Sequence, residues 1–362
     1  MNKFDYNNVH PNFKWNGTSL DKNDLLRLAY DFIKEGEEFE RITGEFILDW
    51  FNNNSFITVT TSGTTGAPKK IQIDKQAMVF SALATAEFFD LKPGNRVLNC
   101  LSSNFIAGKM MLIRSIVLGF EMDFLAPTSY PLKNNINLYD FVAMVPLQAE
   151  NSLIELKNVN KLIIGGAKIN ENLRSQLLVL PTLVYETYGM TETITHVAAK
   201  KITDNYFSVL PNVTISTDSR NCLVIDVPRI SNSTIVTNDV VNIISNSEFE
   251  LLGRFDNVIN SAGVKLFPEQ IEMKLAHKIS TRYFVIGIPD EKYGEQLALV
   301  IEGNPITIGE GFFNDLLPYE KPKAIYFVAN FIETESGKVK RSATLNLDLI
   351  HIKIIFLNFN IF

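Results

Sequence analysis

Short apolar runs alternate with amphipathic segments along most of the chain. Runs of β-branched and aromatic residues are typical of buried strands, and apolar positions three and four apart indicate helices. Their alternation predicts an α/β fold. Strands are predicted at residues 56–61, 97–101, 141–145, 161–166, 182–189 and 223–227, and helices at residues 75–89 and 109–118.

The chain is too long for one compact core, because domains beyond about 250 residues usually divide. Its 362 residues, 46% of them hydrophobic, therefore predict two domains. The net charge of -6 includes no block of like charges of the kind that binds nucleic acid or anchors a protein to a membrane surface. Any phosphate-binding site is expected to be local.

The cysteines and the two ends of the chain indicate a cytoplasmic protein without a membrane span. Cys100 and Cys222 lie far apart and fit neither a disulfide framework nor a zinc site. The four histidines are scattered, so a histidine-ligated metal is not expected. The first thirty residues lack the apolar stretch of a secretory signal. Residues 350–362 are short and interrupted by polar residues, and we expect a terminal strand or an irregular end there.

Residues 58–73, TVTTSGTTGAPKKIQI, combine small hydroxyl residues and glycines with two lysines. Small residues let backbone N–H groups approach an anion closely, and Lys69 and Lys70 add positive charge. The GxxxxGK[ST] pattern cannot be fitted anywhere in the chain. The stretch therefore predicts a phosphate-binding loop of another kind. The alternative is a polar hairpin loop with exposed lysines.

TSGTTGAPK at residues 61–69 resembles the phosphate loop of the adenylate-forming superfamily, which includes acyl-CoA synthetases, luciferases and the adenylation domains of peptide synthetases. Further matches follow in the family's order, and together they are far more specific than any one of them. IIGGA at 163–167 resembles the adenine-pocket segment, YETYGMTET at 185–193 the YGxTE motif, TND at 237–239 the TGD motif, GRFDNVINSAGVKLFPEQIE at 253–272 the hinge with its following loop, and ESGKVKR at 335–341 the terminal GK motif.

The resemblance implies a reaction and a set of site residues. Members form an acyl-AMP from a carboxylic acid and ATP with Mg²⁺, and then transfer the acyl group to a thiol such as that of coenzyme A. Because both reactants of the first step are anions, the site must neutralise and align them. The implied catalytic residues are Lys338, Glu192 and Lys69. The implied ligand contacts are Thr61, Ser62, Gly63, Thr64, Thr65 and Gly66 for pyrophosphate, Gly165, Gly166, Ala167, Tyr188, Gly189 and Thr191 for the nucleotide, Asp239 and Arg254 for the ribose, Glu192 and Thr65 for Mg²⁺, and Gly263 and Lys265 for coenzyme A.

The resemblance also implies two domains. These are a large N-terminal α/β adenylation domain at residues 1–252 and a smaller, mobile α+β C-terminal domain at residues 255–362, with a hinge near residues 254–256 that includes Asp256. Rotation of the small domain would let Lys338 act in the first step and admit the thiol in the second. Only about sixty residues precede the phosphate loop, so we expect a shortened N-terminal domain.

Two positions depart from the family pattern. Asn238 replaces the glycine of the TGD motif, and asparagine tolerates left-handed backbone, so the turn can persist with some strain. Lys340 lies two residues after Lys338, and the proline that commonly precedes this motif is absent, so the role of Lys338 can also fall to Lys340. Arg254 has a second interpretation, which is a surface ion pair with Asp256.

Residues 101–119, LSSNFIAGKMMLIRSIVLG, align with the helix that borders the acid pocket in the family. Phe105 falls where members carry an aromatic residue or histidine that gates the pocket, and Gly108 and Lys109 follow it. Lys109, or failing that Arg114, can pair with a second carboxylate of the substrate. Otherwise both are ordinary cations of an amphipathic helix.

The short chain and its FIAGKMM segment resemble the o-succinylbenzoate–CoA ligases of menaquinone synthesis, whose substrate is a compact aromatic diacid. Two alternatives stay open: an adenylating enzyme for another acid or for a carrier-protein acceptor, and a nucleotide-binding homologue that has lost catalysis. The implied partners are the acid, ATP and coenzyme A, without nucleic acid. The oligomeric state is not predicted.

Overall fold

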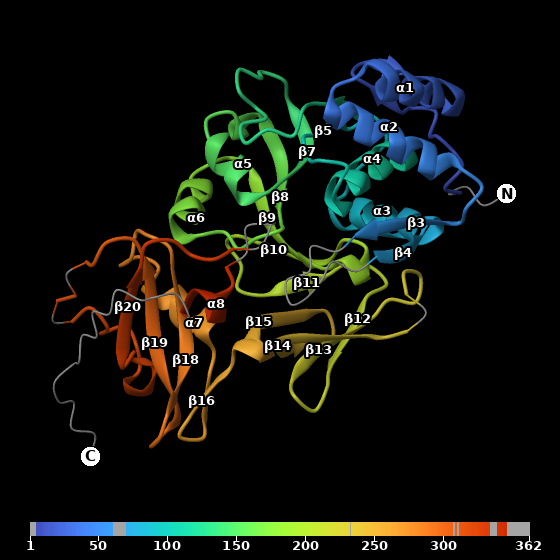
Figure 1. The fold of residues 1–362 in the computed structure, drawn as a ribbon. Helices are drawn as coiled ribbons and strands as arrows, with labels where there is room; N and C mark the ends of the chain where they lie inside the picture. The colour runs from blue at the N-terminus through green and yellow to red at the C-terminus, as the bar shows by residue number, and fades with distance from the viewer. Residues whose placement is uncertain are drawn as a thin grey trace.

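A large mixed sheet dominates the computed structural model (Figure 1), which describes residues 5–60, 70–231, 233–306, 308–309, 311–333 and 339–345. Within these ranges the sheet has 13 strands in the order β12-β13-β14-β15-β11-β10-β9-β8-β7-β5-β6-β1-β2. Their bounds are β1 (Lys14–Trp15), β2 (Thr18–Ser19), β5 (Arg96–Asn99), β6 (Glu121–Phe124), β7 (Tyr139–Met144), β8 (Val159–Ile164), β9 (Leu183–Gly189), β10 (His196–Lys201), β11 (Phe207–Val209), β12 (Thr214–Thr217), β13 (Cys222–Asp226), β14 (Ile235–Ser245) and β15 (Glu248–Arg254).

The neighbouring strands β6, β5, β7, β8 and β9 run parallel and are covered by helices on both faces. Successive side chains of a strand point to opposite faces. Val97 and Phe141 accordingly belong to the core beside α1 to α4, whereas Leu98 and Val142 belong to the core beside α5 and α6. The helices are α1 (Lys22–Glu35), α2 (Glu38–Phe51), α3 (Lys75–Phe88), α4 (Ile106–Leu118), α5 (Pro146–Asn151) and α6 (Glu171–Leu178).

The sheet changes character at β9. Its partner β10 is antiparallel, and so are the pairings that follow out to β12. These strands build a separate core in which the ring of Tyr188 lies 5.3 Å from that of Phe249 and 6.0 Å from that of Phe207. Tyr188 therefore stands where the parallel and antiparallel parts of the sheet meet.

Two smaller sheets complete the described fold. The hairpin of β3 (Phe56–Thr60) and β4 (Lys70–Asp74) flanks residues 61–69, which lie outside the described ranges. The five-stranded sheet contains β16 (Ile259–Ser261), β17 (Val264–Leu266), β18 (Tyr283–Asp290), β19 (Gly294–Glu302) and β20 (Ala324–Val328), with α7 (Pro268–Leu275) and α8 (Arg341–Leu345) beside it. The 3-10 helices are η1 (Leu156–Asn158), η2 (Thr191–Thr193), η3 (Phe255–Asn257) and η4 (Pro318–Glu320).

The chain passes from the 13-stranded sheet to the five-stranded sheet through η3. Beyond it, α7 returns to the end of β15, where the Gln270 side chain donates to the carbonyl oxygens of Leu251 and Leu252 at 3.3 Å each. The connection between the sheets thus lies where the sequence predicts the hinge. The domain limits and the mobility of the smaller part stay predictions.

The predicted alternation of strands and helices is confirmed, with each limit displaced by at most three residues; position 61 of the first strand lies outside the described ranges. The α/β class is confirmed as well. Both cysteines are buried and unpaired. The predicted terminal strand or irregular end at 350–362 lies outside the described residues.

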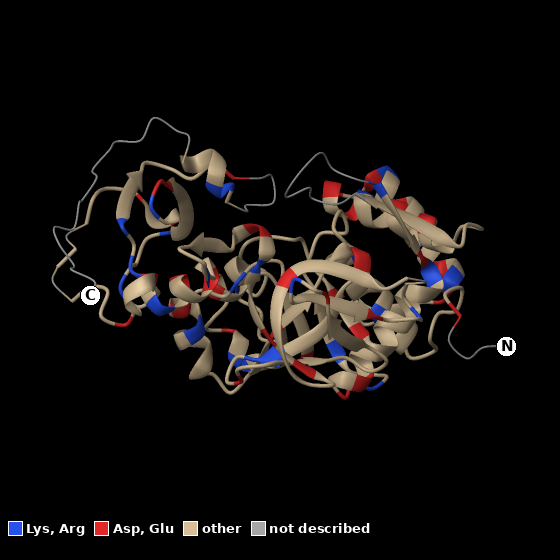
Figure 2. Ribbon diagram, turned by 90° about the horizontal axis from the view of Figure 1, so that it is seen from below, with Lys and Arg blue, Asp and Glu red and all other residues tan. Residues whose placement is uncertain are grey.

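In the described ranges, no helix is both long and apolar enough to cross a membrane. Figure 2 shows basic and acidic residues interspersed over the ribbon, which agrees with the absence of charge blocks in the sequence.

Arg341 ties α8 to the five-stranded sheet. Its Nη1 lies 2.9 Å from Oε1 of Glu272 and donates to the carbonyl oxygen of Val285 at 3.0 Å, while Nη2 lies 3.2 Å from the other Glu272 oxygen. Burial raises the pKa of Glu272 and the positive charge of Arg341 opposes that shift. This pair holds the segment that directly follows Lys338.

We expect Arg341→Ala to lower the free energy of unfolding by about 1.5–3 kcal/mol, because it leaves a largely buried carboxylate without its charged donor. Urea titration followed by circular dichroism measures this. Arg341→Lys keeps the charge and should lose less. Equal stability of the alanine variant and the wild type would show that the Arg341–Glu272 pair does not stabilise the fold.

Candidate active site

A cavity of about 240 Å³ opens at the carboxyl ends of β7, β8 and β9. Parallel strands end at the same edge of a sheet, and ligands of α/β proteins commonly bind there. The start of α4 forms the opposite wall. The lining includes Leu101, Ile106, Ala107, Arg114, Ala143, Met144, Val145, Ile163, Gly165, Gly166, Thr187, Gly189, Met190, Thr191, Ile194, Thr195 and His196.

Two glycines allow the close approach of the elements around this cavity. A Cβ atom on Gly108 would lie 2.3 Å from the carbonyl oxygen of Ser102, so α4 could not begin so near the end of β5. A Cβ atom on Gly189 would lie 2.3 Å from the carbonyl oxygen of Thr195 and would separate β9 from β10. Gly108 thus acts through packing, since it is buried behind the wall and is not among the lining residues.

Arg114 brings a positive charge into a largely apolar wall. Its side chain is 1% exposed, and burial lowers the pKa of the guanidinium to about 9, which leaves it charged at neutral pH. Nη2 donates to Oγ1 of Thr195 at 3.3 Å and Nη1 lies 3.6 Å from the sulfur of Met111, but Nε has no partner. Among the described residues no acidic side chain forms an ion pair with Arg114.

A strained turn brings Thr195 to Arg114. Ile194 has a φ of 67° and a ψ of -57°, and the N–H of Thr195 donates to the carbonyl oxygen of Thr193 at 2.7 Å, which defines a γ-turn. Positive φ is unfavourable for a β-branched residue. Thr195 and His196 were missed from the sequence, where the only available signal is that they directly follow the YGxTE-like motif.

Lys109 lies away from the cavity. Its Nζ donates to the carbonyl oxygen of Ser103 and sits 4.7 Å from the ring centre of Phe46 on α2. Burial lowers the pKa of Lys109 to about 8, and the charges of Asp49 and Glu45 oppose that shift. Of the two cations considered from the sequence, Arg114 and not Lys109 lines the cavity.

Phe105, predicted to gate the pocket, is 61% exposed at the start of α4 and is not among the residues that line the cavity.

The predicted ribose contacts lie together. Tyr188 donates its hydroxyl to Oδ2 of Asp239 at 2.6 Å, and Nε of Arg254 lies 3.5 Å from Oδ1 of the same carboxylate. Burial, and then the charge of Asp239, raises the pKa of Tyr188, so the phenol stays protonated as a donor. Nη2 of Arg254 also lies 3.2 Å from Asp256, so the ion pair considered from the sequence is present.

Asn238 does not occupy a left-handed turn. It lies within β14 and is absent from the described residues with positive φ, so the strain expected from replacing the family's glycine is not found. Its side chain instead accepts from Nη1 of Arg220 at 2.9 Å and donates to Asp256 at 3.3 Å. Arg220, which the sequence did not reveal, also lies over the ring of Phe255.

The remaining predicted residues fall into three groups. Gly165 and Thr191 line the cavity with Gly166, while Ala167 follows in the exposed turn after β8 and Glu192 is exposed in η2. Gly263 and Lys265 lie in the exposed hairpin of β16 and β17. Outside the described residues lie Thr61, Ser62, Gly63, Thr64, Thr65, Gly66, Lys69 and Lys338.

Lys340, the neighbour of Lys338, is described: its backbone N–H donates to the carbonyl oxygen of Ile332 at 2.7 Å. The role of Lys338, or of Lys340 in its place, stays a prediction.

No group of three or more His, Cys, Asp or Glu side chains suited to a metal occurs in the described ranges. A Mg²⁺ ion that is bound mainly through phosphate oxygens and waters needs only one or two protein carboxylates. The exposed carboxylate of Glu192 beside the cavity fits such a site.

Both the sequence and the fold of the chain are similar to those of known proteins. The family model described as AMP-binding enzyme matches residues 49–228. An acyl-CoA synthetase (AMP-forming)/AMP-acid ligase II-like protein from Dyadobacter fermentans is 34% identical, with a TM-score of 0.60 over 88% of this chain and 97% of its own.

Two relatives carry a more specific name. The 2-succinylbenzoate–CoA ligase of Staphylococcus epidermidis is 24% identical over 338 residues, which are 83% of this chain and 71% of that protein. The o-succinylbenzoate coenzyme A synthetase of Bacillus subtilis, solved with ATP and magnesium ion, aligns over 90% of this chain and 82% of its own with a TM-score of 0.72 and 18% identity. The latter likeness confirms the fold.

We expect Asn238→Gly to destabilise the protein by about 1–2 kcal/mol, because it removes two side-chain hydrogen bonds and introduces glycine into a strand. Thermal or urea unfolding measures the change. Asn238→Ser, which keeps one polar group, should lose less. A stabilised glycine variant would instead indicate the backbone strain that was expected from the sequence.

Proposed function

The chain belongs to the AMP-binding enzyme family, and we propose that it is an acid–CoA ligase that joins o-succinylbenzoate to coenzyme A in a reaction driven by ATP. The main observation behind this choice of acid is Arg114, which lies buried in the cavity wall with its Nε unpaired. The names of the relatives from S. epidermidis and B. subtilis support the same substrate.

A buried charge without a counter-charge is costly, and a guanidinium recognises a carboxylate through two parallel hydrogen bonds. An acid with a second carboxylate would supply both the charge and the acceptor for Nε of Arg114. The other walls of the cavity suit an aromatic ring, since Ile106, Met144 and Ile163 are among its lining residues. An aromatic diacid satisfies both requirements.

The first step would be attack of the free substrate carboxylate on the α-phosphate of ATP, which yields acyl-AMP and pyrophosphate. In the second step the thiol of coenzyme A attacks the acyl carbon, and AMP leaves. The reacting groups of the first step repel one another, so catalysis requires alignment and neutralisation more than covalent participation by the protein.

We assign the nucleotide to the edge of the cavity formed by β8 and β9. Asp239, held by Tyr188 and Arg254, offers carboxylate oxygens to the two ribose hydroxyls. Glu192 would bind Mg²⁺, which neutralises phosphate charge when present. Residues 61–69 and Lys338 are assigned to the phosphates and to the reacting carboxylate, respectively.

We also propose that the five-stranded sheet with α7 and α8 turns about η3 between the two steps. Two observations support this. Within the described residues the chain crosses between the sheets once, through this short segment, and the hairpin of β16 and β17 carries Gly263 and Lys265 directly after it. A hinge needs only a few such residues at the ends of elements.

The function is tested by measuring pyrophosphate release from ATP and Mg²⁺ with a panel of acids, with and without coenzyme A. We expect release with o-succinylbenzoate and formation of its coenzyme A thioester. Turnover of another acid alone would overturn the substrate. Release that yields no coenzyme A thioester would indicate another acceptor, such as a carrier protein. Nucleotide binding without release for any acid would indicate a non-catalytic homologue.

We expect Arg114→Met to reduce kcat/KM for o-succinylbenzoate about 10- to 100-fold, the value of a charge-assisted hydrogen bond, and to spare aromatic acids with a single carboxylate. Folding should be retained because an unpaired buried charge is removed. Lys109→Met is the matched variant, and it should change kcat/KM for o-succinylbenzoate little. A larger loss of kcat/KM in the Lys109→Met variant would indicate instead that Lys109 binds the second carboxylate of the acid.

A further inference from the structure

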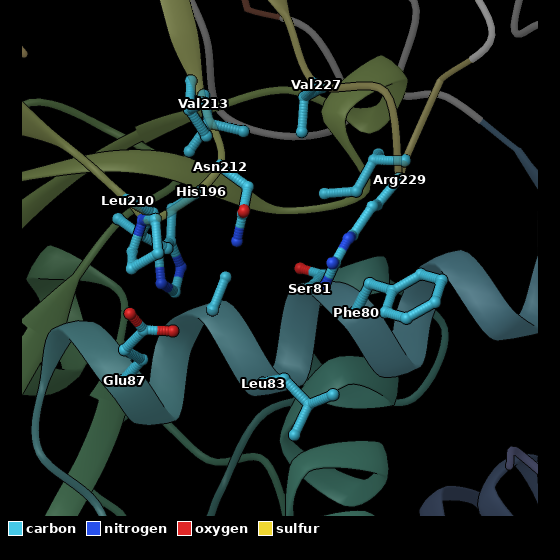
Figure 3. Close-up of a pocket in the computed structure, with 14 residues that line it drawn as sticks. Phe80, Ser81, Leu83, Glu87, His196, Leu210, Asn212, Val213, Val227 and Arg229 are labelled. Carbon is cyan, nitrogen blue, oxygen red and sulfur yellow. The ribbon is translucent and has the colours of Figure 1, made fainter. Parts of the chain in front are cut away.

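A second, smaller cavity of about 60 Å³ lies beside the first, between α3, the start of β10 and the segments that follow β11 and β13 (Figure 3). Its walls are mostly apolar and include Leu83 on α3 and Leu210, Val213 and Val227 from the antiparallel part of the sheet. Arg229 covers one side, with its guanidinium 5.4 Å from the ring centre of Phe80.

His196 is shared by the two cavities. Of the described residues, it alone belongs to the lining of both. The residue before it, Thr195, lines only the larger cavity, and the residue after it, Val197, lines only the smaller one. The first residue of β10 therefore stands at the boundary between the two spaces.

The imidazole is fixed from several sides. Nε2 lies 3.3 Å from Oγ1 of Thr85 on α3, Nδ1 lies 3.5 Å from Oγ1 of Thr195, and the ring meets that of Phe89 edge to face at 6.0 Å. The side chain is buried, and burial together with the charge of Arg114 holds its pKa well below the usual range. A neutral ring in this position fills space without competing for the substrate carboxylate.

We propose that His196 is the residue that limits the size of the acid: its side chain closes the larger cavity against the smaller one, and a smaller residue would join the two. This inference rests on the proposed function, in which the larger cavity holds the acid. The apolar walls beyond His196 would then accept a longer hydrophobic extension of the substrate. His196 is thus assigned to specificity and not to either chemical step.

The experiment compares two acyl-sulfamoyl adenosines, which mimic acyl-AMP without reacting. One carries the o-succinylbenzoyl group, and the other carries the same group with a propyl substituent on the ring. Calorimetry gives the ratio of their dissociation constants for the wild type and for His196→Ala. A single poorly accommodated methylene changes such ratios about 10- to 200-fold, so we expect the variant to shift the ratio at least about tenfold toward the propyl compound.

Val213→Ala is the matched control, because it enlarges the smaller cavity without removing the wall. It should leave the ratio close to the wild-type value. If His196→Ala does not fold, His196→Asn provides the same comparison, since it is smaller than histidine and keeps a polar group beside Thr195. An unchanged ratio in a folded His196 variant, or an equal shift in Val213→Ala, would overturn the inference.

Failure of the proposed function gives a different result, because the wild type would then bind neither adenylate mimic. In that case the crystal structure of the His196→Ala variant decides the inference. One continuous cavity through position 196 would support it, and two cavities that stay separate would overturn it.

Discussion

The charge of Arg114 is the constraint on which the proposed site depends. Burial of a guanidinium that is 1% exposed, with one unpaired nitrogen, is costly, so the surrounding structure must hold it in place. The surrounding structure does so through α4, which is brought close by Gly108, and through Thr195, which is held by a strained γ-turn at Ile194. Both features lie at one end of the cavity, where the acid is proposed to bind.

The change of strand direction at β9 links this end to the proposed ribose site. β9 pairs in parallel with β8 and antiparallel with β10, so its last residues face two environments. Gly189 and its neighbours border the larger cavity, while Tyr188 reaches across to Asp239 on β14. A single strand end would therefore set the distance between the proposed acid and ribose sites, which is the alignment that attack on the α-phosphate requires.

The contacts around Asn238 join the predicted ribose residues to η3. Arg220, Asn238 and Asp256 form a continuous set of hydrogen bonds, and Arg254 contacts both Asp239 and Asp256. The proposed movement about η3 would disturb the two contacts of Asp256, and it would thereby couple the proposed ribose site to the orientation of the five-stranded sheet. The asparagine that departs from the family pattern contributes directly to this connection.

The sequence by itself determined the features that depend on local chemistry. Periodicity identified the strands and helices of the α/β fold, because side-chain alternation is a local property. The ordered motifs identified the family, and they placed Tyr188, Asp239 and Arg254 in the set that proves to be in contact. Only the tertiary structure decided which of Lys109 and Arg114 lines the cavity. The two residues lie five positions apart on one helix, and which of them faces the cavity depends on the packing of α4 against α2 and β10. Thr195, His196 and Arg220 likewise gain their roles from contacts across the fold, which no local pattern encodes.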